Sequence, residues 1–284
     1  MHEADYEALS YEWGTGLGDQ ERLPEIKIGD SELSITPNLD LALRHIRLED
    51  KPRNVWADAV CINQYDDSEK GSQIQLMEDI YRTAKNVLVW LGLETEQSRF
   101  GMDILRYFTN KDASALDPVW ERMPPDLCKA GLNDILGRSY FSRIWVMQEV
   151  ALSQRTIILC GDLRFSWSSD PQSQKYFIRM IKLAAISPAW EQMGLTEIDF
   201  SNLLYRLELQ QQRGTPRPRD IVDIAYDTRL QKATDRRDKI FGILGLCQDP
   251  VFRDLIPINY DEDVYQVYRG FVEAVETHDR VSGE

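Results

Sequence analysis

The fold is decided by the stretch from Val55 to Gly92, VWADAVCINQYDDSEKGSQIQLMEDIYRTAKNVLVWLG. Its first part, residues 55–62, is short and mostly apolar and predicts a buried strand that enters a polar loop. From Ser72 onward, apolar residues recur with the period of an amphipathic helix. The continuous apolar run 87–92 has the length of a strand. Strand, helix and strand within about 40 residues predict a βαβ unit, hence a parallel sheet with helices on its faces.

Further elements are predicted on both sides of this unit. Toward the N-terminus we expect a strand over residues 6–13 that leaves into a glycine-rich loop, a hairpin of residues 25–28 and 32–35 around Gly29 and Asp30, and a helix opened by Pro37. Toward the C-terminus we expect a short helix at 132–136, a helix over 138–152, strands at 156–160 and 163–165, and mostly helices after 171, interrupted at 214–218. The fold class predicted is α/β.

Composition excludes several classes of function. The 284 residues include 33 Lys and Arg against 47 Asp and Glu, a net charge of −14. Nucleic acids and anionic membranes attract basic faces, so neither is expected as a partner. The four cysteines form no CxxC pair and the chain has only three histidines, which predicts neither a metal site nor a disulfide framework. Without a leader or an apolar run of ~18 residues, we expect a cytoplasmic location.

Most residues of the usual catalytic types favour a structural interpretation. His45 is the one realistic histidine base, and it follows the face of the predicted helix that carries Leu43 and Ile46. Cys61 lies in an apolar run and is interpreted as a small buried hydrophobe. The glycines at 14, 16 and 18 resemble a phosphate-binding loop only loosely, because no GxxxxGK[ST] motif is present.

The helix predicted over 138–152 contains the most informative acidic residue. Ser142, Trp145 and Glu149 are spaced i, i+3 and i+7, so they would share one helix face. In one interpretation Trp145 is core and Glu149 pairs with Arg143 or Arg138. In the other, the apolar neighbour desolvates a carboxylate that binds ribose hydroxyls or stabilises an oxocarbenium-like transition state. The spacing leaves both open.

Three blocks read in order resemble the fungal heterokaryon-incompatibility (HET) domain. They are ALSYEWG at 8–14, WADAVCINQ at 56–64 continuing to VWLG at 89–92, and RIWVMQEV at 143–150. The segment ATDRRDKIFGILGL at 233–246, followed by INY at 258–260, resembles the region usually found downstream of that domain. The resemblance implies a HET core over residues 1–168 and a mainly helical extension of the HET region over 169–284.

The HET family is distantly similar to Toll/interleukin-1 receptor (TIR) domains, and this similarity implies a flavodoxin-like parallel sheet flanked by helices. The hairpin near Gly29 and the insertion between Gly92 and Leu132 are additions to that pattern. Many TIR domains cleave NAD⁺ at the nicotinamide–ribose bond with a glutamate, and Glu149 is the position that matches. The resemblance thus implies a fungal cell-death or allorecognition effector for which NAD⁺ is a substrate, with no resident cofactor.

A ligand in an α/β sheet lies outside the carboxyl ends of the strands, which would place the loops after Tyr11, Asp58 and Trp90 around Glu149. We expect Tyr11 or Trp13 to form an aromatic wall, and Ser10 and Asp58 to be polar contacts. Structural interpretations remain open for Trp13, as a loop anchor, and for Asp58, as a helix-cap or turn residue. The remaining site residues expected are Ser142, Arg143 and Trp145, with Arg143, Arg138 and Arg44 as candidates for the pyrophosphate.

Two classes of function follow. The first is an NAD⁺ glycohydrolase that depletes the cofactor. The second is a non-enzymatic signalling module that acts by self-association or by binding an upstream receptor or allorecognition partner, with an inactive regulatory homologue as a weaker variant. A homo-oligomer is expected under either class.

Overall fold

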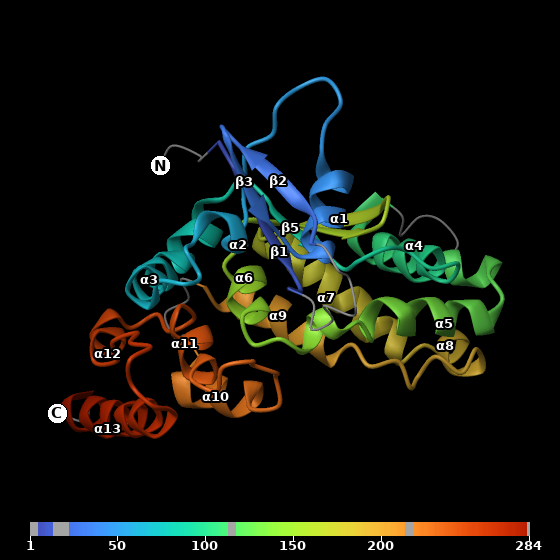
Figure 1. Cartoon of the computed structure of the whole chain (residues 1–284). Helices are drawn as coiled ribbons and strands as arrows, with labels where there is room; N and C mark the ends of the chain where they lie inside the picture. The colour runs from blue at the N-terminus through green and yellow to red at the C-terminus, as the bar shows by residue number, and fades with distance from the viewer. Residues whose placement is uncertain (1–4, 14–22, 113–117, 214–218, 283–284) are drawn as a thin grey trace.

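A five-stranded sheet in the order β4-β1-β5-β6-β7 forms the centre of the molecule (Figure 1). The computed structural model describes residues 5–13, 23–112, 118–213 and 219–282. Pairing is parallel from β4 through β1 and β5 to β6, and antiparallel between β6 and β7. The strands are β1 (Glu7–Tyr11), β4 (Val55–Trp56), β5 (Val87–Trp90), β6 (Arg155–Cys160) and β7 (Leu163–Ser168). The predicted α/β class with a mostly parallel sheet is confirmed.

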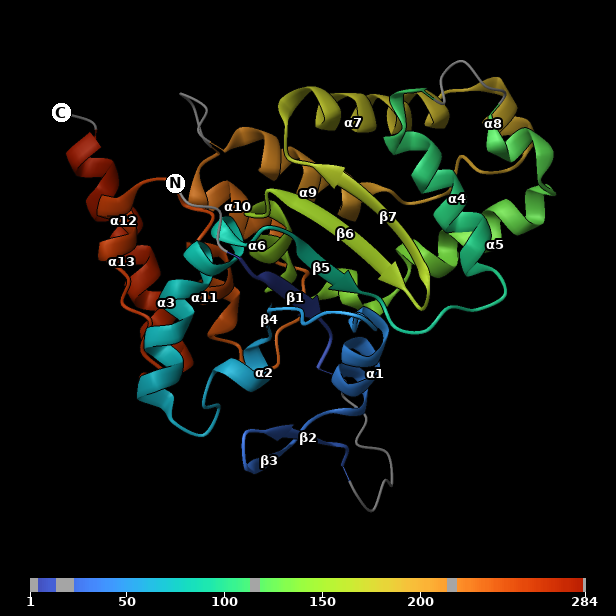
Figure 2. The ribbon, with the colours of Figure 1, turned by 90° about the horizontal axis from the view of Figure 1, so that it is seen from above.

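Helices cover both faces of this sheet, and a separate hairpin lies beside it (Figure 2). The hairpin consists of β2 (Glu25–Ile28) and β3 (Ser31–Ser34). The helices before β6 are α1 (Pro37–Ile46), α2 (Asp58–Cys61), α3 (Asp67–Thr83), α4 (Ser98–Thr109), the 3₁₀ helix η2 (Val119–Arg122), α5 (Pro125–Leu136), the 3₁₀ helix η3 (Ser139–Ser142) and α6 (Val146–Ala151). After β7 follow α7 (Pro171–Ala185), α8 (Pro188–Gln192), α9 (Ser201–Gln212), α10 (Ile221–Thr228), α11 (Asp238–Leu244), α12 (Pro250–Asp254) and α13 (Val264–Ser282).

The strand order creates a switch point between β1 and β5. Counted along the chain, the strands of this sheet are arranged 2-1-3-4-5, so the chain leaves β1 on one side and returns on the other. In open α/β sheets of this kind, ligands bind outside the carboxyl ends of the strands at the switch point. Those ends are Tyr11 in β1 and Trp90 in β5, which are register partners.

Alternate residues of β1 pack in two separate apolar clusters. Leu9 and Tyr11 pack with α1 through Leu39, while Ala8 belongs to the larger cluster that contains α3, α6 and the later helices. Because successive side chains of a strand point to opposite faces, Ser10 lies on the Ala8 side. Ser10, the residue before the C-terminal end of β1, therefore presents its hydroxyl toward α6.

Several predicted boundaries are wrong. The helix expected at 132–136 begins earlier, at Pro125, and the strand expected at 163–165 continues to Ser168. Three further errors have an identifiable reason. The strand expected over 55–62 ends after two residues, and one turn of helix, α2, follows from Asp58. Helix α3 begins at Asp67 rather than Ser72, because the Asp66 carboxylate caps it by accepting the amides of Ser68 and Glu69. The third concerns the helix expected over 138–152.

That helix is interrupted between η3 and α6. The Ile144 amide donates to the carbonyl oxygen of Lys232 at 2.9 Å, and the Lys232 amide donates in turn to the Ser142 carbonyl oxygen at 2.5 Å. These bonds hold residues 143 and 144 outside any helix, because the Ser142 carbonyl and the Ile144 amide on either side of Arg143 pair with a distant segment. A contact 90 residues along the chain thus overrides the local helical pattern.

The insertion before α6 is helical rather than loop-like. Helices α4 and α5 pack closely where Gly101 meets Gly131, since a Cβ on Gly101 would lie 2.2 Å from the Gly131 carbonyl oxygen. Phe108, Trp120 and Trp190 form an aromatic cluster beneath them, with ring centroids 5.3 to 6.0 Å apart. Sequence analysis missed α4, whose apolar face follows a polar start at Ser98.

The helices after β7 share the large apolar cluster with the sheet through residues such as Phe177, Leu207 and Phe241. Helices α12 and α13 lie beside α3, at the end of the molecule opposite α5 and α8 (Figures 1 and 2). None of the helices in the described ranges is long and apolar enough to cross a membrane. The glycine-rich loop 14–18 and the expected linker 214–218 lie outside the described residues.

Candidate functional site

A buried carboxylate, Glu149 of α6, lies against the C-terminal end of β1. Glu149 is 5% exposed, and its carboxylate accepts a hydrogen bond from the Ser10 hydroxyl. Ser10 Oγ also lies 2.6 Å from the Tyr140 hydroxyl oxygen. Because the Ser10 proton goes to Glu149, Tyr140 is the donor to Ser10. The result is a chain of three side chains, Tyr140 to Ser10 to Glu149, which we call the Glu149 relay.

The protein environment raises the pKa of Glu149 to about 7, mainly because burial disfavours the charged form. The Ser10 hydrogen bond and the positive charge of Arg143 lower this pKa, while the negative charge of Asp58 raises it. A carboxylic acid with a pKa near neutrality exchanges protons readily under physiological conditions, which general acid–base catalysis requires.

Asp58 and Trp13 form a second polar contact near the same strand ends. The Trp13 indole nitrogen donates to Asp58 Oδ2 at 2.8 Å, and Asp58 Oδ1 accepts the Ala59 amide at 2.7 Å. Burial raises the pKa of Asp58. The buried Tyr11 hydroxyl has no hydrogen-bond partner among the described residues, and its pKa is raised mainly by burial and further by the negative charge of Asp58. Asp58 is thus the first residue of α2 rather than its cap, which is Ala57, and its carboxylate holds the half-buried Trp13.

Two cations influence Glu149 without pairing with it. Arg143 donates to the Tyr11 carbonyl oxygen and, within the described part of the chain, has no carboxylate partner. Arg206 of α9 is 1% exposed and donates to the carbonyl oxygens of Asn202 and Phe141, at 2.6 and 2.7 Å. Its pKa is lowered to about 10 by burial. Of the two, Arg143 is half-buried and lies at the end of β1, so its guanidinium is suited to binding an anionic group.

The other predicted cations lie elsewhere. Arg138 donates to the carbonyl oxygens of Leu91 and Leu93 and pairs with Asp134 at 3.1 Å. Arg44 is exposed and pairs with Asp40 on α1. The pairing of Glu149 with Arg143 or Arg138, one of the two sequence-based interpretations, is not found, because both guanidinium groups bond to other partners.

Ser142 and Trp145 do not share a helix face with Glu149, because α6 begins only at Val146. The Ser142 hydroxyl donates to the Ser139 carbonyl oxygen at 2.7 Å, within η3. The Trp145 indole nitrogen donates to Asp238 Oδ2 at 3.0 Å. Asp238 Oδ1 accepts the Tyr260 hydroxyl at 2.6 Å, so Trp145 connects α6 to the C-terminal helices.

Sequence reasoning missed Tyr140, Arg206 and Asp238. Tyr140 lies shortly before the block RIWVMQEV, and Asp238 lies within the downstream block DRRDKIFG. Closeness to these blocks was the one sequence signal that could have indicated a role for either residue. Arg206 lies in a helix without such a block. Its burial follows from packing of α9 against η3 and α6.

The site contains no metal-binding group. Within the described residues, no three His, Cys, Asp or Glu side chains lie close enough to hold an ion. The four cysteines are free, and Cys128, Cys160 and Cys247 are buried, whereas Cys61 is exposed rather than buried as expected. His45 contacts the Trp90 ring and the Leu41 carbonyl oxygen. Its ring therefore serves packing on α1.

Fold and site together define an α/β domain with a buried carboxylate of raised pKa beside its switch point. The chain belongs to the Heterokaryon incompatibility protein (HET) family, whose pattern matches residues 6–149 and so ends at this carboxylate. It is similar to heterokaryon incompatibility protein 6, OR allele, of Neurospora crassa, with 27% identity over 292 residues that cover 86% of this chain and 43% of that protein. The chain thus spans less than half the length of that relative. No solved structure matches it.

Proposed function

We propose that this protein is a heterokaryon-incompatibility effector that promotes cell death by cleaving the nicotinamide–ribose bond of NAD⁺, with Glu149 as the catalytic carboxylate. The observation that carries this proposal is the Glu149 relay: a carboxylate with a pKa of about 7, bonded to Ser10 beside the switch point. Family membership supports the incompatibility role. The strand order 2-1-3-4-5 is the flavodoxin-like one and supports a TIR-like core.

The chemistry requires one well-placed carboxylate. When the bond between ribose C1′ and the pyridinium nitrogen breaks, both electrons go to nitrogen, and nicotinamide leaves as a neutral molecule. Positive charge develops on the ribose, and an ionised Glu149 would stabilise it. Water then adds to C1′ and loses a proton, which Glu149 with its pKa near 7 accepts. The products are ADP-ribose, nicotinamide and a proton.

The remaining site residues have proposed roles around that carboxylate. Arg143, which lacks a carboxylate partner among the described residues, would bind the pyrophosphate. Trp13, held by Asp58 and half-buried, would stack on a base of the substrate, with Tyr11 packed behind it. Ser10 would release the Glu149 carboxylate when a ribose hydroxyl takes its place. Ser142 and Trp145 have no proposed contact with substrate, because both are bonded away from Glu149.

The test compares nicotinamide release from NAD⁺ by the wild-type chain, Glu149→Gln and Glu149→Ala. Loss of the carboxylate is expected to lower the rate by at least about 100-fold, the usual effect of removing one electrostatic group from a transition state. Glu121→Gln is the matched control, because Glu121 is exposed on η2, and it should leave the rate unchanged. Absence of nicotinamide release from concentrated or self-associated wild-type protein would refute the enzymatic proposal.

A second function, a non-enzymatic signalling module, is favoured by the burial of the same group. Glu149 is 5% exposed and its carboxylate is bonded within the protein, as a structural acid would be. Under that proposal the chain acts in the cytoplasm through a homo-oligomer or a receptor partner. Expression of Glu149→Gln in a fungal host distinguishes the two, since killing persists for the signalling module and disappears for the enzyme.

A further inference from the structure

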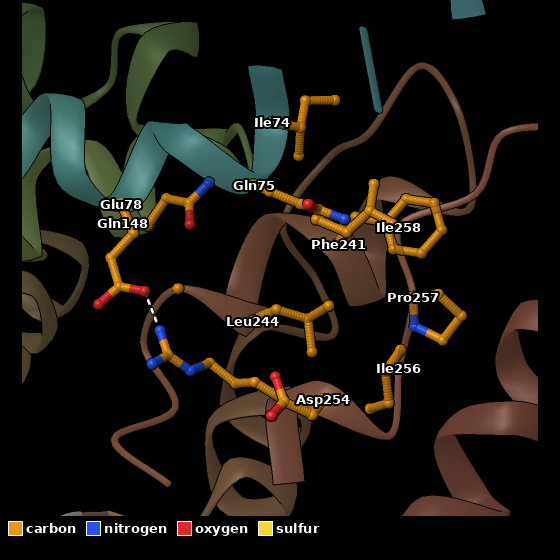
Figure 3. Close-up of a pocket in the computed structure, with 12 residues that line it drawn as sticks. Ile74, Gln75, Glu78, Gln148, Phe241, Leu244, Asp254, Ile256, Pro257 and Ile258 are labelled. Atoms are coloured by element: carbon orange, nitrogen blue, oxygen red, sulfur yellow. Dashed lines mark hydrogen bonds and ion pairs between the residues drawn. The ribbon is translucent and has the colours of Figure 1, made fainter. Parts of the chain in front are cut away.

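A cavity of about 370 Å³ is lined by residues of α3, α6, α11 and α12 (Figure 3). This volume is within the range of small-molecule sites. Neither Ser10 nor Glu149 lines it. Its walls contain both polar and apolar side chains, and the apolar ones join the HET-matched segment to the C-terminal helices through Ile74, Phe241, Leu244, Ile256 and Ile258.

The most deeply buried polar group in this wall is the side-chain amide of Gln148. The residue is 2% exposed, and the nitrogen of its amide has no hydrogen-bond partner among the residues that the structure describes. Buried amides are nearly always hydrogen-bonded, because an unpaired one loses its bonds to water without replacement. This amide in the cavity wall therefore has an unpaired donor, Nε2, with its oxygen, Oε1, beside it.

Gly245 of the opposite wall permits this position of the amide. A Cβ at residue 245 would lie 2.5 Å from Gln148 Oε1, closer than atoms pack. Any side chain there would push the amide aside. The Gln148 amide is thus held in one place in the cavity wall, with the phenyl ring of Phe241 and aliphatic side chains around it.

Charges at the rim indicate which ligands fit. Glu78 forms an ion pair with Arg253 across the cavity (Figure 3). Arg82 pairs with both Glu78 and Asp79, so the two carboxylates and the two guanidinium groups neutralise one another. Asp254 at the rim is exposed and adds a negative charge. An anionic ligand would be repelled by Asp254, whereas an uncharged one would not.

We propose that this cavity binds a small uncharged ligand that carries an amide-type edge, a hydrogen-bond donor beside an acceptor, on an apolar ring. That edge pairs with the Gln148 amide, and the ring packs on Phe241 and Leu244. Aromatic carboxamides and nucleobases share this chemistry. Because the ligand contacts both α6 and α11, its binding stabilises the attachment of the C-terminal helices to the HET core. The inference does not depend on NAD⁺ cleavage.

The test uses benzamide and uracil as probes of the two sources, with benzoate as the anionic control, in ligand-observed NMR and thermal-shift titrations of the whole chain. Saturable binding of benzamide, uracil or both is expected, with benzoate at least tenfold weaker. Gln148→Met, which keeps the shape and removes the amide, should weaken binding at least about tenfold. Gln192→Met, exposed on the distant α8, is the matched control and should bind as the wild type does.

A second readout keeps the proposal falsifiable without a ligand. If the Gln148 amide is unpaired, Gln148→Met raises the unfolding temperature of the ligand-free protein, because it removes a desolvated polar group. A lower unfolding temperature for this variant overturns the proposal, as it would show an amide already satisfied. So does the absence of saturable binding by both probes, or equal affinity of wild type and Gln148→Met.

Discussion

Glu149 and Gln148 are neighbours on one short helix, both are almost fully buried, and their surroundings differ completely. Glu149 faces β1, where Ser10 and Tyr140 complete its hydrogen bonds. Gln148 faces α3 and α11, where its amide meets a cavity and the amide nitrogen has no partner in the described residues. A rotation of about 100° along the helix separates the two environments. Burial alone therefore does not define the role of a polar residue. The role depends on whether the protein itself supplies the hydrogen-bond partners or leaves them to a ligand.

The comparison depends on how α6 is held. The helix has six residues, too few to be stable alone, so packing determines its position. Asp238 binds the Trp145 indole immediately before α6 and the Tyr260 hydroxyl after α11. The downstream region thereby orients α6, a helix of the HET-matched segment. Four substitutions test the Glu149 side of α6, its Gln148 side and the contacts of Asp238 that hold the helix.

The largest effect is expected for Glu149→Gln and depends on pH. The folded-state pKa of Glu149, about 7, exceeds its ordinary 4.5, so ionisation destabilises the fold progressively between these pH values. A difference of 2.5 pKa units corresponds to about 3 kcal/mol above pH 7. Relative to wild type, the variant should have similar stability at pH 4 and gain up to about 3 kcal/mol at pH 8. Guanidinium unfolding at both pH values measures this, and a pH-independent difference would contradict it.

Asp238→Ala should follow, with a loss of about 2 kcal/mol, because it leaves the Trp145 and Tyr260 donors unpaired in a largely buried place. The loss is moderated because burial raises the pKa of Asp238, so its charge is itself unfavourable there. Urea unfolding gives the magnitude. Asp238→Asn retains one acceptor oxygen and is the conservative control. An alanine variant as stable as wild type would mean that α6 is positioned without this contact.

Ser10→Ala should destabilise the protein by about 1 kcal/mol, since it removes the middle member of the Glu149 relay. The Ser10 bond lowers the pKa of Glu149, so its loss raises that pKa further. The expected signature is a titration of Glu149 displaced to higher pH, measured by NMR of the side-chain carboxyl carbon. An unchanged titration would show that Ser10 does not act on the carboxylate. Ser34→Ala, exposed in the separate hairpin, is the control.

The smallest effect is expected on the cavity side. Gly245→Ala places a methyl group against Gln148 Oε1 and should cost about 1 kcal/mol, since a side chain rather than backbone must move. In the double variant Gln148→Ala and Gly245→Ala, the two effects should be less than additive, because the clash is gone. Thermal unfolding of the four proteins closes the cycle. Strict additivity would show that Gly245 does not constrain the amide.

Much of the fold was predictable because the strands have strong local signals. The apolar runs at β1 and β5 and the turn at Gly161, where φ is +53°, follow from composition and spacing. The start of α3 was misplaced, since Asp66 and Ser72 are both plausible caps by sequence. The break before α6 had no local signal at all. It exists because Lys232 bonds with Ser142 and Ile144.

The sequence by itself determined that the chain is an α/β protein of the HET family and that Glu149 is the acid to examine. Tertiary structure decided what that acid contacts: Ser10 rather than Arg143 or Arg138, with Ser142 and Trp145 bonded elsewhere. It also placed Gln148 at a cavity that no motif announces. The physical reason is the range of the interactions involved. Apolar periodicity is written in neighbouring residues, whereas a carboxylate's partners and pKa depend on which distant segments fold against it.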